Sequence, residues 1–165
     1  MDTTVRTAYR AILWAGTICA VLDGLSAVVR AIMLGGTPIR VFQGIASGFL
    51  GPRAFSGGTG SALLGLAVHF TVAFTAAAVY VAASRTVPLL NEHPILSGIA
   101  YGIGVHLFMA FVVIPASAIG SRPIVWSNFR AILLIHMIVV GPSIAVTVAR
   151  VTASMPVQGG THDAS

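Results

Sequence analysis

Four apolar runs, each long enough to cross a lipid bilayer, constrain the fold of this chain more than any other feature. At ~1.5 Å per residue, about 20 helical residues cross the hydrocarbon core. Only 8% of the 165 residues are charged and 56% are hydrophobic, whereas a soluble domain carries about 25% charged residues. We therefore predict an all-α integral membrane protein, a four-helix transmembrane bundle in a single membrane domain over residues 1–150. The predicted spans are residues 11–33, 61–84, 95–114 and 129–149.

The segment between the first two spans is rich in glycine and is not predicted to be a fifth span. Residues 35–60 hold eight glycines and two prolines. Thr37-Pro38 is a typical helix start, because proline is favoured at the first helical position. We predict a short helix over residues 38–50 that lies in the membrane interface, with Gly44 and Gly48 docked on the bundle. A phosphate-binding loop is disfavoured, because the Gly-Lys-Ser/Thr sequence is absent.

Prolines and short connections predict how the spans end and adjoin. Pro115 is expected to stop the third span, and Gly141-Pro142 is expected to kink the fourth, because proline removes a backbone hydrogen bond. The short connection over residues 85–94 predicts that the second and third spans are antiparallel neighbours. The small, polar C-terminal tail, residues 151–165, is expected to be disordered.

All nine basic residues are arginines, and they lie near the ends of the apolar runs rather than in one cluster. This placement indicates anchoring at the lipid headgroups of a bilayer and not nucleic-acid binding. With four spans both termini share a side, which we place in the cytoplasm because two arginines precede the first span. The arginine count is nearly equal: Arg6, Arg10, Arg85 and Arg150 on the terminal side, and Arg30, Arg40, Arg53, Arg122 and Arg130 on the opposite side.

Four ionisable residues interrupt the apolar runs: Asp23, His69, His106 and His136. Counted from the span ends on the side without the termini, they lie 7 to 10 residues deep. This corresponds to roughly 10 to 15 Å, so all four are expected at one level of the bundle. Small residues at helical spacing predict that the second and third spans turn their histidines inward. These packing residues are Gly65 and Ala73 beside His69, and Gly98 and Gly102 beside His106.

Several chemistries fit such a layer. In a structural role, neutral histidines hydrogen-bond between helices, with Asp23 protonated or paired with Arg30. A proton or ion path is the second interpretation, because His and Asp change charge. Haem or a transition metal is the third, because three imidazoles and a carboxylate are suitable ligands, although no local ligand motif is present. No Ser or Cys nucleophile has a recognisable setting. We therefore assign no catalytic residue, and expect a structural or assembly protein without a cofactor.

Part of the chain resembles a known group of proteins. The segments GLAVHFTVAFTAAAVY at 65–80 and HPILSGIAYG at 93–102, the loop from Pro115 to Pro123, and His136 resemble a family of uncharacterised bacterial multi-pass inner-membrane proteins similar to the YagU group. The resemblance implies a bacterial inner membrane as the location and a link to acid tolerance. It implies no catalytic residues. The expected partners are the lipid bilayer and, since four spans without a repeat are few for a transporter, further copies in a homo-oligomer.

Overall fold

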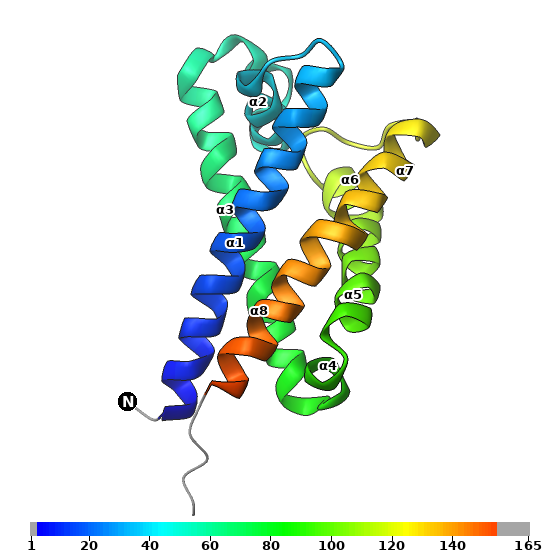
Figure 1. Cartoon of the computed structure of the whole chain (residues 1–165). Coiled ribbons are helices and arrows are strands. Elements are labelled where there is room, and N and C mark those ends of the chain that lie inside the picture. Colours follow the sequence, from blue (N-terminus) through cyan, green and yellow to red (C-terminus); the bar gives the residue numbers. More distant parts are fainter. Residues whose placement is uncertain (1–2, 155–165) are drawn as a thin grey trace, which may run out of the picture.

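The computed structural model describes residues 3–154 and contains no strand in that range. Four helices in it are long and apolar enough to cross a membrane (Figure 1). The all-α four-span prediction is confirmed. Each helix extends past its predicted apolar run, because the helices continue into their polar ends. The spans are α1 (Thr3–Met33), α3 (Gly58–Thr86), a third helix over Pro94–Ala116 and a fourth over Trp126–Ala153.

Short elements connect the spans. Helix α2 (Pro38–Leu50) has the predicted bounds, begins after an extended Thr37 and ends at Gly51, whose φ is 57°. A 3-10 turn, η1 (Gly51–Ser56), leads into α3, and α4 (Leu89–Glu92) joins α3 to the third span. The chain therefore needs no long loop between its first three spans.

Two π-helical segments interrupt the third and fourth spans. The third consists of α5 (Pro94–Phe108), η2 (Met109–Val113) and α6 (Ile114–Ala116). The fourth consists of α7 (Trp126–Ile135), η3 (His136–Val140) and α8 (Gly141–Ala153).

Each π segment ends two residues before a proline, Pro115 or Pro142. Proline has no N–H and its ring collides with the carbonyl four residues earlier, and a wider π turn relieves that collision. Pro115 therefore does not stop the third span as predicted, because the helix continues to Ala116.

The spans form an open row rather than a closed ring. Helix α1 packs on α3 and on α8, and α8 packs on α5. The predicted neighbours α3 and α5 meet only near their shared connection. There the rings of Tyr80 and Tyr101 are 5.0 Å apart, and the Tyr101 hydroxyl donates to the Ala76 carbonyl at 2.7 Å. Beyond these tyrosines α3 and α5 diverge, which leaves one side of the bundle open.

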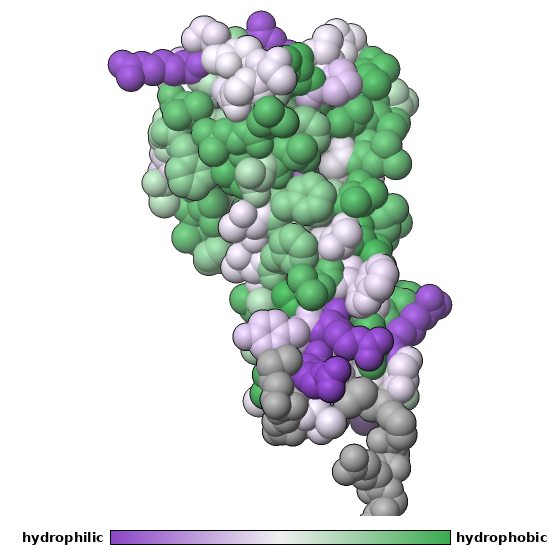
Figure 2. All heavy atoms as spheres, turned by 90° about the vertical axis from the view of Figure 1, so that its left-hand side faces the viewer, coloured by the Kyte–Doolittle hydropathy of each residue, from purple (hydrophilic) through white to green (hydrophobic). Residues whose placement is uncertain are grey.

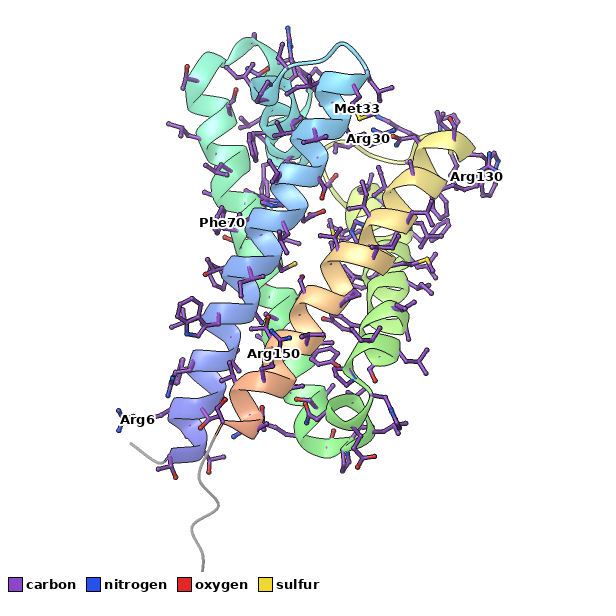
Figure 3. All side chains as sticks on the ribbon, in the orientation of Figure 1. Arg6, Arg30, Met33, Phe70, Arg130 and Arg150 are labelled. Atoms are coloured by element: carbon purple, nitrogen blue, oxygen red, sulfur yellow. The ribbon has the colours of Figure 1, made fainter. Side chains whose placement is uncertain are left out.

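The surface has the pattern of a membrane protein. Figure 2 shows a broad hydrophobic band between hydrophilic ends. Arg30 and Arg130 lie at one end of the molecule and Arg6 and Arg150 at the other (Figure 3), in agreement with the predicted sides. Helix α8 continues to Ala153, so the prediction of disorder from residue 151 was wrong for its first three residues. Residues 155–165 of the predicted tail lie outside the described part.

Candidate functional site

His69 joins the second span to the first. Its Nε2 lies 2.9 Å from the Ala20 carbonyl oxygen on α1, and the side chain is buried. A carbonyl only accepts, so Nε2 carries the hydrogen and donates it. A Cβ atom at Gly24 would come within 3.2 Å of Nε2, so a glycine on α1 leaves the space that the ring occupies. Phe42 and Phe70 contact the ring edge to face.

Asp23 faces the other nitrogen of the same ring. Its Oδ2 lies 4.0 Å from His69 Nδ1, and its side chain is 26% exposed. This distance is too long for a direct hydrogen bond. Because Nε2 already holds a hydrogen, Nδ1 presents either a lone pair or the N–H of an imidazolium. The pair can therefore hold a single proton on the carboxyl group or on the ring.

His106 and His136 form a second pair, between the third and fourth spans. Their ring centroids are 5.1 Å apart, and the Phe129 ring lies 4.5 Å from that of His106. The two helices approach closely because Gly102 faces the His136 carbonyl, where any Cβ atom would collide with the backbone.

The two histidines of this second pair differ in their hydrogen bonds. His136 Nδ1 lies 2.9 Å from the Ile132 carbonyl on its own helix, so it carries the hydrogen. His106 is only 5% exposed, and its Nε2 is buried without a hydrogen-bond partner among the described residues. A buried polar atom without a partner costs about 1–3 kcal/mol.

The four predicted polar residues therefore form two pairs and not one site. Asp23 and His69 join α1 to α3, whereas His106 and His136 join α5 to the fourth span. Within residues 3–154 no group of three or more His, Cys, Asp or Glu is placed to hold a metal ion. The histidine rings of the second pair touch each other, which leaves no space for a haem macrocycle between them.

The expected ion pair between Asp23 and Arg30 is not formed among the described residues. Arg30 instead donates from Nη2 to Asn128 Oδ1 at 2.7 Å, and the Asp23 carboxyl group faces His69. The seven-residue spacing put Arg30 on the same face as Asp23, but Arg30 lies at the end of α1, where its long side chain reaches the start of α7. This contact ties the first span to the fourth.

The small residues named from the sequence lie at close contacts between helices. Gly65 faces the Phe42 carbonyl of α2, Gly98 lies against Pro142 and Gly141, and Ala73 is in the buried core. All these contacts are within one chain.

The Gly44 and Gly48 face of α2 was predicted to dock on the bundle, and this was wrong. A Cβ atom at Gly44 would meet nothing within 4 Å, and one at Gly48 would meet only Ser117, at 3.9 Å. Helix α2 docks instead through Phe42 and Ala46, whose backbones cross Gly65.

Two partners in these contacts were missed from the sequence. Gln43 of α2 is buried and donates from Nε2 to the Gly58 carbonyl at 3.0 Å. The sequence pattern that could have revealed this contact is a polar residue, Gln43, on the helix face that also carries Ala46. Gly141 was predicted only to kink its helix, although a Cβ atom there would collide with the Gly98 carbonyl. A glycine in an apolar run is the general signal for such a contact.

Comparison with models of protein families, with curated proteins and with solved structures finds no match to this chain.

Proposed function

We propose that this chain is a structural or assembly protein of the bacterial inner membrane, in which the two polar pairs set how the spans pack. The observation that carries this is the contact of His69 Nε2 with the Ala20 carbonyl. In hydrocarbon such a bond between helices stabilises by ~0.6 kcal/mol on average, and up to ~1.7. It also fixes the rotation of α3 against α1, because the ring must point at one carbonyl.

The wider assignment rests on sequence and surface pattern. The four apolar helices support a multi-pass membrane location, and the resemblance to the YagU group supports the bacterial inner membrane. Both described chain ends lie at one end of the molecule (Figure 1), and we place that end in the cytoplasm. An assembly role implies contact with further copies or other membrane proteins through surfaces that remain open.

A proton-responsive or transport function is the second candidate. The specific observation in its favour is His106 Nε2, which is buried without a partner among the described residues. A water molecule that enters the bundle can exchange a proton with it. The Asp23–His69 pair adds a second place where one proton can reside.

Proton flux and folded yield separate these two functions. His69→Leu and His136→Leu would each be reconstituted into vesicles containing a pH-sensitive dye, with His93→Leu, in an exposed connection, as the control. The structural role predicts reduced folded yield for His69→Leu and no proton flux above empty vesicles for any protein. Flux through the unchanged chain that disappears in well-folded His136→Leu would overturn the structural proposal in favour of transport.

A further inference from the structure

The open side of the bundle holds a long apolar groove. A hollow of about 1100 Å³ lies between α2, α3 and the third span, with Val41, Ile45, Val72 and Val113 among its walls. A second hollow of about 450 Å³ continues from it to Tyr101. Val72 and Val113 line both hollows, so they form one groove along α3.

Glycines widen the groove that the diverging helices leave open. Gly44 lines the first hollow and Gly104 the second, and a Cβ atom at either would meet nothing within 4 Å. The π segment η2 contributes Met109, Val112 and Val113 to the same wall. An empty apolar groove loses dispersion contacts, and at this depth the available filling is a hydrocarbon chain.

The end of the groove at α2 is strongly basic. The connections at this end, residues 34–57 and 117–125, contain three arginines and no acidic residue. Arg40 is next to Val41 of the groove wall and is bound to Phe55, through the Phe55 carbonyl and the Phe55 ring. The side chains of Arg53 and Arg122 have no hydrogen-bond partner within residues 3–154, although the Arg53 carbonyl accepts from Ser56. Their guanidinium groups remain available for a phosphate, which arginine binds with two hydrogen bonds.

We propose that this groove binds an anionic phospholipid, with acyl chains along α3 and the headgroup phosphate at the arginine-bearing end. Charge argues against a second copy as the occupant. Two copies inserted in the same orientation would place their basic ends side by side, where like charges repel. An anionic headgroup neutralises that end instead, and each arginine near a membrane surface contributes about 1 kcal/mol to attraction of anionic lipid.

Native mass spectrometry of the full chain tests the proposal. Phosphatidylglycerol and phosphatidylcholine with identical acyl chains would be titrated separately into detergent-solubilised protein. We expect one phosphatidylglycerol to be retained per chain. The affinity for phosphatidylcholine should be about fivefold lower for each arginine at the headgroup, because its choline cation cancels the negative charge of the phosphate. Arg122→Gln should reduce this preference by about fivefold. Equal retention of both lipids would overturn the headgroup assignment.

A variant that fills the groove provides a second test of the proposal. Gly44→Leu should lower phosphatidylglycerol affinity at least about tenfold, because leucine takes volume that the acyl chain needs. Gly60→Leu is the matched control, since Gly60 is also a helical glycine with open space around it but lies outside the groove walls. Unchanged lipid affinity in folded Gly44→Leu would overturn the proposal. So would loss of a dimer mass in Gly44→Leu with lipid retention intact, which would identify the groove as a contact between copies.

Discussion

The α1–α3 contact and the α5–fourth-span contact each bury a histidine between two spans, but they hold it in different ways. His69 has a carbonyl acceptor on the facing helix and a carboxyl group on its other side. His106 lies against the rings of Phe129 and His136, and its Nε2 has no hydrogen-bond partner among the described residues. The helices around His106 are instead joined by backbone contact at glycines.

The difference indicates how each contact is stabilised. Where Gly98, Gly102 and Gly141 bring two backbones together, van der Waals contact over the whole interface stabilises the pair. A histidine there is not needed for cohesion, so its nitrogen can remain unpaired. Between α1 and α3, Phe74 fills the space at Gly16, and the hydrogen bond of His69 fixes the rotation of the helices.

The largest expected effect is at the glycine contact. Gly102→Ala places a methyl group against the His136 carbonyl, and because backbone cannot move aside we expect a loss of about 3 kcal/mol in the free energy of unfolding, the upper part of the range for overpacking. SDS titration in bicelles would measure it. Gly104→Ala, two residues away with open space around it, is the control. Equal stability of the two variants would contradict the close contact.

The hydrogen-bonded histidine should have an intermediate effect. His69→Leu removes the bond to Ala20 and leaves Asp23 without its partner. We expect a loss of about 0.6–2 kcal/mol in unfolding free energy in the same titration, as for other hydrogen bonds between membrane helices. His93→Leu should leave stability unchanged, since His93 is exposed. A His69→Leu protein as stable as the unchanged chain would contradict a structural role for this hydrogen bond.

Replacing Asp23 should lower the free energy of unfolding less than replacing His69. The carboxyl group is 4.0 Å from the ring and partly exposed, so Asp23→Asn should cost about 0–1 kcal/mol. The double variant Asp23→Asn/His69→Leu then isolates the coupling between the two side chains. A coupling larger than that of the Ala20 bond would mean that the ion pair, rather than the hydrogen bond, holds α1 to α3.

The smallest effect is expected at His106. His106→Leu removes a buried nitrogen that has no partner among the described residues, so the unfolding free energy should stay within about 0.5 kcal/mol or rise. The same bicelle titration, run beside His69→Leu, makes the comparison direct. A destabilisation equal to that of His69→Leu would show that the two contacts are not distinct.

Hydropathy and helix geometry were sufficient to predict much of the fold from the sequence. These two properties alone predict the number of spans, the bounds of α2 and the inward faces around His69 and His106. They did not predict which residues would pair, because depth along a helix leaves the order of the helices undetermined. The row α3–α1–α8–α5 separates His69 from His106.

Local geometry limited the prediction in two further places. The π segment η3 begins at His136, and a 3.6-residue period cannot predict side-chain directions across it. The end of α1 directs Arg30 toward Asn128 rather than back along its own helix to Asp23.

Nitrogen-15 NMR of the histidine-labelled chain in bilayers tests the central claim most directly, because the shifts of the two ring nitrogens report which one carries a hydrogen and whether it is bonded. Signals would be assigned by single histidine replacements. We predict a hydrogen-bonded Nε2–H for His69, a hydrogen-bonded Nδ1–H for His136, and no hydrogen bond at His106 Nε2. A hydrogen-bonded Nε2 at His106, or an unbonded Nε2 at His69, would contradict the distinction between the two contacts.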